Sequence, residues 1–224
     1  MRLAAFRDTR HAVWVTYGPD DFQRSTDVSR ETREAISIHL DLLQRWAPRL
    51  NLVGPGQLDE FWKRHALDSA QLLAHAPNAR RWVDLGSGAG FPGLVVACCL
   101  IGREGASVDL VESNSKKAAF LREAIRATGA PARVIADRVE TVAAGATSYE
   151  VVTARAFAPM ARIIDLAGPI LQRGAIGLFL KGEGVEAELR EAGERWALRY
   201  ELFPSLSDPR GRIIRVDGAE RGSA

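Results

Sequence analysis

The sequence lacks the features that mark secreted and membrane-embedded proteins. It contains only two cysteines, the neighbours Cys98 and Cys99. Adjacent residues on a helix point about 100° apart, so no structural disulfide is expected between them. No apolar run approaches the roughly 18 residues of a membrane-spanning helix, and charges interrupt the amino-terminal stretch where a signal peptide would have its apolar core. We therefore expect a cytoplasmic protein without a membrane partner.

Neither sign of charge dominates the composition. Thirty basic residues stand against 28 acidic residues, a net charge of +2. This balance permits a polyanionic partner such as RNA but does not demand one. Hydrophobic residues make up 46% of the 224 residues and charged residues 26%, which are the proportions of an ordinary folded protein. The length suits one α/β domain with an extension, and we expect a monomer.

The first 78 residues predict an arm and a helical extension packed on the core. Residues 1–28 show no clear period, so we expect an arm with one short helix at most. Apolar residues then recur every three or four positions over 29–50 and again over 58–73, the spacing of two amphipathic helices. The sequence Gly54-Pro55-Gly56 predicts a turn between them.

Residues 79–217 alternate between short apolar runs and amphipathic segments, which predicts strands joined by helices in a mostly parallel sheet. The loop 204–210 is too short for a crossover helix, so the last strand should run antiparallel to the strand before it. We predict an α/β fold of the Rossmann-like class I S-adenosylmethionine-dependent methyltransferase type, with seven strands and a disordered tail over 218–224. The expected strands are 82–85, 108–112, 133–136, 150–154, 175–180, 198–203 and 211–216.

One stretch, RWVDLGSGAGFPGLVV at 81–96, has the pattern of a ligand site. A buried strand carrying Asp84 leads into glycines at 86, 88, 90 and 93 and then into an apolar helix. Glycines suit a backbone that turns sharply and lies against a ligand. Residues 88–93 also match G-x-G-x-x-G, so NAD or FAD stays an alternative. Asp84 would repel a pyrophosphate at the helix N-terminus and attract the cationic S-adenosylmethionine, which we favour.

Polar residues also follow the other strands, at the edge where an open α/β sheet binds its ligands. Glu112 ends the second strand and could accept hydrogen bonds from both ribose hydroxyls. Val139 and Glu140 follow the third strand and could meet the adenine. Arg155 stands between two alanines at the end of the fourth strand, which favours a place in the site over an ordinary surface arginine. His65 has no second His or Cys to complete a metal site, so no metal is expected.

Two absences narrow the reaction. No Asn/Asp-Pro-Pro-aromatic segment, as found in enzymes that methylate exocyclic amines, follows the fourth strand, and no Pro-Cys nucleophile exists. A ring nitrogen such as guanine N7 needs neither, because methylation of its lone pair releases no proton and alignment with the donor suffices. Three hypotheses stay open: a guanine methyltransferase of RNA, a methyltransferase of a small molecule or protein, and a non-catalytic S-adenosylmethionine-binding regulator.

Basic residues in the helical extension and at the sheet edge are candidate RNA contacts. The alternative is that these charges lie on ordinary solvated faces. The candidates are Arg64, His65, Lys181, Arg210 and Arg212.

Several segments occur in the order seen in one family. They are SRET at 29–32, LLQRWAPRLNLV at 42–53, RHALDS at 64–69, DLGSGAGFPG at 84–93, DRVE at 137–140, ARAFAP at 154–159 and LKGE at 180–183. Over about residues 25–216 the chain resembles the ribosomal small subunit methyltransferase G family, also called glucose-inhibited division protein B. The resemblance implies methyl transfer from S-adenosylmethionine, with S-adenosylhomocysteine as product, to N7 of one guanine in the decoding-region loop of 16S rRNA in the small ribosomal subunit.

The predicted donor site combines positions matched to the family's motifs with positions argued from the strand ends. Arg155 is also the one candidate catalytic residue. The motif match supplies Gly86, Phe91, Val139, Glu140 and Arg155, and the strand-end argument adds Asp84, Gly88, Gly90 and Glu112.

Overall fold

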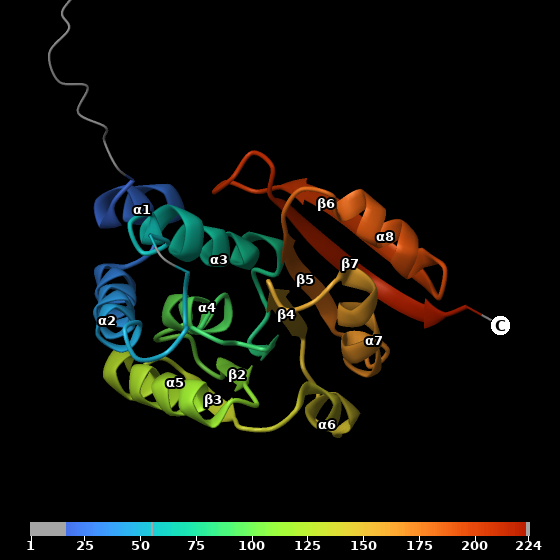
Figure 1. Cartoon of the computed structure of the whole chain (residues 1–224), viewed down its shortest axis with the longest axis horizontal. Coiled ribbons are helices and arrows are strands. Elements are labelled where there is room, and N and C mark those ends of the chain that lie inside the picture. Colours follow the sequence, from blue (N-terminus) through green and yellow to red (C-terminus); the bar gives the residue numbers. More distant parts are fainter. Residues whose placement is uncertain (1–16, 55, 223–224) are drawn as a thin grey trace, which may run out of the picture.

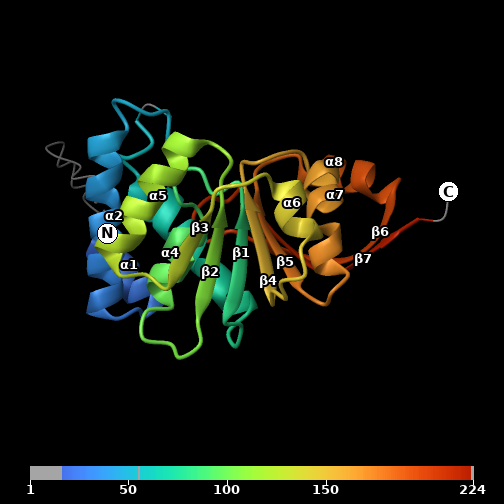
Figure 2. The same ribbon diagram turned by 90° about the horizontal axis from the view of Figure 1, so that it is seen from below.

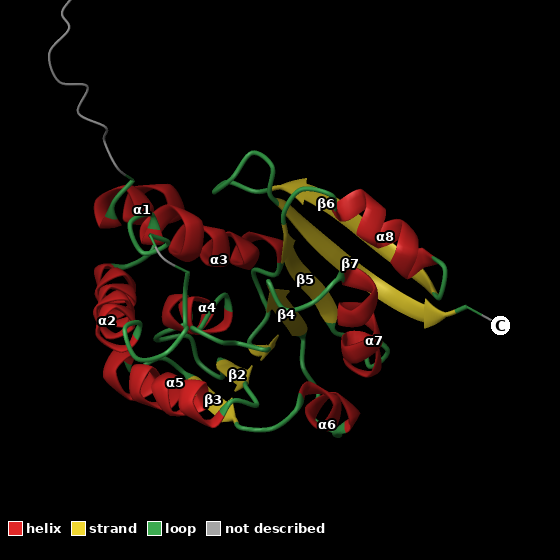
Figure 3. Ribbon diagram, viewed as in Figure 1, coloured by secondary structure: helices red, strands yellow, loops and turns green. Residues whose placement is uncertain are grey.

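The strands of the protein form one sheet (Figure 3) in the computed structural model, which describes residues 17–54 and 56–222. They are β1 (Arg81–Leu85), β2 (Ser107–Val111), β3 (Ala132–Ile135), β4 (Val151–Arg155), β5 (Ile176–Lys181), β6 (Trp196–Pro204) and β7 (Arg212–Arg221). Their order is β3-β2-β1-β4-β5-β7-β6. Strands β1 to β5 pair in parallel, and β7 pairs antiparallel with β5 and β6. The predicted seven-stranded, mostly parallel sheet with an antiparallel last strand is confirmed.

The strand order places the functional edge of the sheet. From β1 the chain passes to β2 and β3 on one side, and then crosses to β4 and β5 on the other. The order therefore reverses between β1 and β4. Ligands of open α/β sheets bind beyond the carboxyl ends of the strands at such a point.

Helices cover both faces of the sheet, and Figure 2 shows the two groups on opposite sides. Each group encloses its own hydrophobic core. Strands β1, β2, β4 and β5 are buried along most of their length, because helices cover both of their faces, whereas most of β6 is exposed. One group is α1 (Pro19–Thr26), α2 (Arg30–Trp46), α4 (Gly93–Cys99) and α5 (Ser115–Thr128), and the other is α6 (Val139–Ala144), α7 (Met160–Leu171) and α8 (Val185–Gly193). None of the helices in the described residues combines the length and the apolar character that a membrane span requires.

The amino-terminal extension packs on the same core as α4 and α5 (Figure 1). Helix α1 is the one short helix expected in the arm, and Phe22 is its buried residue. Helix α2 begins after Ser29, whose hydroxyl accepts a hydrogen bond from the Thr32 amide, a standard N-cap. Residues 1–16 of the predicted arm and Pro55 of the predicted turn lie outside the described residues.

The second predicted helix of the extension changes its pitch along its length. It is a π-helix in η1 (Trp62–Leu67), an α-helix in α3 (Asp68–Ala70) and a 3₁₀-helix in η2 (Gln71–His75). The wider π turn alters which side chains share a face. As a result Trp62, His65 and Ala66 are all buried.

Two expectations from the sequence were wrong. Helix α6 was not predicted, because its six residues are too few to display a helical period. The tail was placed from residue 218 onward, whereas β7 continues to Arg221 and pairs there with Trp196 at the start of β6. The backbone hydrogen bonds of this long hairpin order residues that sequence composition marked as frayed. Residues 223–224 lie outside the described residues.

Candidate functional site

The glycine turn between β1 and α4 lies tightly against its neighbours. Gly86, Gly88 and Gly90 have φ angles of 71°, 54° and 94°, a left-handed region that glycine adopts without strain. A Cβ at Gly86 would overlap the ring of Phe157. At this position both the backbone conformation and the close approach require glycine.

Asp84 supports this turn from beneath. Its side chain is fully buried. One carboxylate oxygen accepts a hydrogen bond from the Gly93 amide at 3.2 Å and the other from the Thr153 hydroxyl at 2.8 Å. Burial raises the pKa of Asp84 to about 6, although these hydrogen bonds oppose the rise. The predicted direct contact between Asp84 and the donor is therefore corrected, because the carboxylate faces the start of α4 and not a cavity.

Glu112 ties the end of β2 to the glycine turn. Its Oε2 accepts from the Gly88 amide at 3.0 Å, and its Oε1 accepts from the Asn114 amide at 2.7 Å. Each carboxylate oxygen has a second lone pair, so Glu112 can still accept hydrogen bonds from ribose hydroxyls. This position fits the donor-binding role predicted for it.

A groove of about 250 Å³ lies beside the turn and suits an adenine ring. Val139, Glu140 and Phe157 line it together with Ser113, which follows β2. Val139 is buried, and Phe157 also lies over Gly86, so the groove and the turn are continuous. The Glu140 carboxylate lies 2.6 Å from Arg162. These residues fit the adenosyl part of S-adenosylmethionine.

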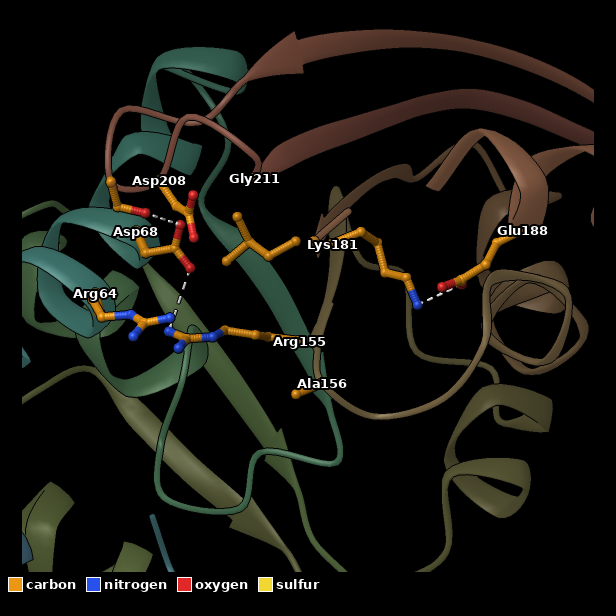
Figure 4. Close-up of a pocket in the computed structure, with 11 residues that line it drawn as sticks. Arg64, Asp68, Arg155, Ala156, Lys181, Glu188, Asp208 and Gly211 are labelled. Atoms are coloured by element: carbon orange, nitrogen blue, oxygen red, sulfur yellow. Dashed lines mark hydrogen bonds and ion pairs between the residues drawn. The ribbon is translucent and has the colours of Figure 1, made fainter. Parts of the chain in front are cut away.

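Arg155 is held on three sides by groups from the extension and from the glycine turn. Its Nη2 donates to His65 Nδ1 at 2.8 Å, and its Nη1 lies 3.4 Å from Asp68 Oδ2. Its guanidinium also lies over the Phe91 ring, 5.7 Å from the centroid. The His65 and Phe91 rings are stacked, with centroids 4.6 Å apart. The RHALDS segment therefore fixes where Arg155 points (Figure 4).

His65 is a buried neutral base, and its prediction as an RNA contact was wrong. Only 4% of the residue is exposed. Burial, together with the neighbouring charge of Arg155, lowers the pKa of His65 to about 3. A neutral imidazole can accept the Arg155 hydrogen bond, which an imidazolium cannot. A spacing of three and four residues could not predict this burial, because His65 lies in a π-helical turn.

A second cavity, of about 260 Å³, lies on the other side of the β4–α7 segment. We call it the acceptor cavity. It combines positive and negative side chains from four separate parts of the chain (Figure 4). Its lining residues are Arg64, Asp68, Arg155, Ala156, Leu180, Lys181, Gly182, Glu188, Ser207, Asp208 and Gly211.

The remaining RNA-contact candidates differ in how far their charges are available. Lys181 is largely buried, with Nζ 2.6 Å from Glu188, and Arg212 donates to two carbonyl oxygens of its own loop. Arg64 lines the acceptor cavity and lies 3.4 Å from Glu60. Arg210 is the most exposed, with 69% of its side chain accessible. Arg64 and Arg210 are thus the better placed candidates to meet a phosphate.

A family model described as rRNA small subunit methyltransferase G (GidB) matches residues 32–209. The chain belongs to this family. A relative from Rhodopseudomonas palustris (strain BisB5), named ribosomal RNA small subunit methyltransferase G, is 47% identical over 95% of this chain and 94% of its own length. A relative with the same name from Bradyrhizobium sp. (strain BTAi1) is 50% identical over 88% of this chain and 89% of its own. The predicted family is confirmed.

Solved structures of low sequence identity share the fold. A putative O-methyltransferase from Klebsiella pneumoniae superposes with a TM-score of 0.55 at 12% identity, covering 82% of this chain and 90% of that chain. Magnesium protoporphyrin IX methyltransferase from Synechocystis, solved with bound S-adenosylmethionine, superposes with a TM-score of 0.53 at 14% identity, covering 80% and 97%. The predicted methyltransferase fold is confirmed, and the chain is a methyltransferase by family.

Three acidic residues of the acceptor cavity, Asp68, Glu188 and Asp208, were missed from the sequence. Asp68 lies within the RHALDS segment, which could have identified it. Its Oδ1 accepts from the Ser207 hydroxyl at 2.6 Å and from the Ser205 hydroxyl at 3.1 Å, so it joins the extension to the β6–β7 loop. Asp208 lies in that loop, and no motif marks it. Only the folded chain brings it to the cavity.

Proposed function

We propose that this protein transfers the methyl group of S-adenosylmethionine to N7 of guanine 527 in the 16S rRNA of the small ribosomal subunit. Family membership supports the reaction and the substrate. The single observation that carries the proposal is the pair of cavities flanking the β4–α7 segment. The adenine groove contains Phe157, and the acceptor cavity contains its near neighbours Arg155 and Ala156. The two cavities are therefore lined by adjacent residues of the β4–α7 segment, so a donor in one cavity can lie next to a guanine in the other.

The residues beside the glycine turn fit the donor. Backbone groups of the turn would hold its amino-acid part, Glu112 its ribose, and Val139 with Glu140 its adenine ring. When bound, S-adenosylmethionine supplies a methyl group activated by a sulfonium. The protein's own contribution is to align that methyl group with the acceptor nitrogen.

The acceptor cavity suits a reaction that needs no general base. The nearest imidazole, His65, is neutral, but its Nδ1 already accepts from Arg155. Guanine N7 has no proton to lose. The methylated base instead gains a positive charge, and carboxylates placed around it stabilise that charge as it develops. Asp68, Asp208 and Glu188 supply them.

The decisive experiment maps the modified nucleotide by mass spectrometry after incubation with S-adenosylmethionine and unmodified 16S rRNA or small subunits. We expect one N7-methylguanine, at guanine 527. Methyl transfer to a small-molecule or protein fraction in a cell extract, with none to RNA, would favour the second hypothesis. Donor binding without transfer to any fraction would favour a regulator. The proposal places the enzyme in the cytoplasm, as a monomer.

A further inference from the structure

A cavity that accepts guanine for methylation at N7 must meet two chemically different edges of the base. N7 and O6 are acceptors on one edge, whereas N1–H and the 2-amino group are donors on the other. Enzymes that act on an extruded base recognise its Watson–Crick edge by hydrogen bonds. A suitable cavity therefore has an N–H donor near the methyl donor and a carboxylate away from it.

The side of the acceptor cavity next to the glycine turn offers the N–H donor. Arg155 Nη1 is buried and lies 3.4 Å from Asp68 Oδ2 in an ion pair, but it makes no hydrogen bond within the described residues. An unsatisfied buried donor is costly, and O6 of a bound guanine would satisfy it. Because O6 adjoins N7, this contact would direct N7 toward the donor side.

The opposite side of the cavity offers the carboxylate. Figure 4 shows Asp208 and Ala156 on opposite sides of the space. Asp208 belongs to the β6–β7 loop, which is held by a hydrogen bond from the Gly211 amide to the Asp208 carbonyl at 2.9 Å. The loop is also fastened to Asp68 through Ser207. Asp208 therefore lies at the cavity in a loop whose conformation is fixed by these hydrogen bonds.

Of the three acids in the cavity, Asp208 has the most unused hydrogen-bonding capacity. Asp68 already accepts from the Ser205 and Ser207 hydroxyls and pairs with Arg155. Glu188 pairs with Lys181 at 2.6 Å and accepts from the Met160 amide at 2.7 Å. Asp208 Oδ1 accepts from the Arg210 amide at 2.9 Å, and its Oδ2 has no hydrogen bond within the described residues.

We infer that Asp208 is the residue that selects guanine, by accepting hydrogen bonds from N1–H and the 2-amino group of the target base. The inference rests on the proposed guanine-N7 function and adds the residue that recognises the base. Adenine would present the unprotonated N1 to the same carboxylate, and two acceptors facing each other repel. The acid therefore both attracts guanine and rejects adenine.

The test compares RNA carrying guanine at the target position with RNA carrying inosine there, which lacks only the 2-amino group. The wild-type protein should methylate the guanine RNA with a kcat/KM about tenfold higher or more, as expected for loss of a buried base contact. Asp208→Ala should reduce this ratio to about one, because the guanine reaction loses its contacts to N1–H and the 2-amino group whereas the inosine reaction loses only the contact to N1–H. Asp208→Asn, which keeps one side-chain acceptor, should give an intermediate ratio.

Glu183→Ala is the matched control. Glu183 and Asp208 lie at nearly equal distances from Arg210, 3.8 Å and 3.7 Å, but Glu183 does not line the acceptor cavity. Both variants remove one negative charge beside the same arginine. Glu183→Ala should keep the wild-type preference for guanine, whatever it does to overall RNA affinity. Thermal unfolding would show that each variant is folded.

The outcomes separate this inference from the function on which it rests. A wild-type ratio near one, or a full preference retained in Asp208→Ala, would overturn the role of Asp208 while the guanine methylation itself stands. A lowered guanine-to-inosine ratio in Glu183→Ala would show that the preference depends on the negative charge near Arg210 in general. That result would also overturn the role of Asp208. If the wild-type protein methylates no RNA, the proposed function fails instead.

Discussion

The two sides of the functional edge are built in different ways. The donor side consists of the glycine turn, Glu112 and the groove at Val139 and Glu140. Its polar contacts are largely backbone amides, as where Glu112 accepts from Gly88 and Asn114. The acceptor side is the acceptor cavity, where charged side chains meet one another, as in the Lys181–Glu188 and Arg155–Asp68 pairs.

This difference follows from what each side has to recognise. A donor shared by many enzymes can be held by a short segment, because a tight turn and a strand-end acid fix its position. A particular base in a particular RNA needs side chains of defined charge at defined places. Such groups are gathered from distant parts of the chain.

The largest effect is expected on the donor side, from Gly86→Asp. The new side chain would overlap the Phe157 ring and would force a φ of 71° on a residue with a Cβ. We expect the affinity for S-adenosylmethionine, measured by calorimetry, to fall at least about 100-fold. Near-normal affinity would refute the placement of the donor.

Gly102→Asp is the control for that variant. Gly102 also has a positive φ, 78°, but a Cβ there would meet no atom within 4 Å. The substitution should cost only backbone strain, on the order of 1 kcal/mol of unfolding free energy. Donor affinity should stay as in the wild type.

The sequence predicted the donor side more completely than the acceptor side. The turn, Glu112 and the segment at 139–140 lie where the pattern placed them, since each follows directly from a strand end. Asp84 was the exception, because its position near the end of a strand does not tell whether its side chain points to the ligand or to the helix behind the turn. The Asp84 carboxylate accepts a hydrogen bond from the Gly93 amide and so stabilises the turn.

The acceptor side could be predicted only in part, and through the family. Arg155 was found from its strand-end position, but it was predicted as a donor-binding residue, whereas it lines the acceptor cavity. His65 was wrongly placed on the surface, because a π-helical turn rotates it inward and a three-four spacing cannot show this. Asp208 was missed because its loop reaches the cavity through long-range contacts, among them Ser207 with Asp68, 139 residues apart.

The next largest effect is expected on the acceptor side, from Arg155→Ala. Removal of the guanidinium leaves Asp68 and His65 without their shared partner. We expect kcat/KM for RNA methylation to fall about 100-fold or more, as when a preorganised donor is deleted from an active site. Donor affinity should fall much less, because Arg155 lines the acceptor cavity.

Two further variants sharpen this prediction. Arg155→Lys keeps the charge but not the planar fork that contacts both His65 and Asp68, so it should be impaired to an intermediate degree. Arg195→Ala removes an arginine that pairs with Asp165 outside both cavities and should leave the rate unchanged. An unaltered rate in Arg155→Ala would exclude a role for Arg155 in methyl transfer.

The two sides should also respond oppositely to pH. The pKa of His65 falls from 6.5 to about 3 on folding, so the unfolded chain binds more protons and stability is lost as pH falls below 6.5. The pKa of Asp84 rises from 3.8 to about 6, so its contribution is present at low pH and is lost as pH rises through 6. The two contributions have opposite signs between pH 5 and 7.

Denaturant unfolding at pH 5 and pH 7 tests these signs. His65→Gln should reduce the gain in stability from pH 5 to pH 7 by about 2 kcal/mol relative to the wild type. Asp84→Asn should increase that gain by about 1 kcal/mol. Changes of the same sign in both variants would contradict the assigned protonation states. Because each variant is compared with itself at the two pH values, any change in its stability that does not depend on pH cancels.

The smallest effect is expected from Asp68→Asn, which leaves Arg155 in place but removes the charge that orients it. We expect kcat/KM to fall about tenfold, with little change in the unfolding temperature, because an asparagine can still accept from Ser205 and Ser207. A purely structural role for Asp68 would lower the unfolding temperature in step with activity.

A double-mutant cycle distinguishes positioning of Arg155 from a direct action of Asp68 on the substrate. If Asp68 acts through Arg155, then Asp68→Asn should have almost no further effect on methylation in an Arg155→Ala protein. If Asp68 contacts the base itself, the two losses in rate should multiply, which means that the changes in activation free energy add. That result would assign Asp68 to recognition of the base, together with Asp208, and not to positioning of Arg155. The acceptor side would then depend still more on residues from distant parts of the chain.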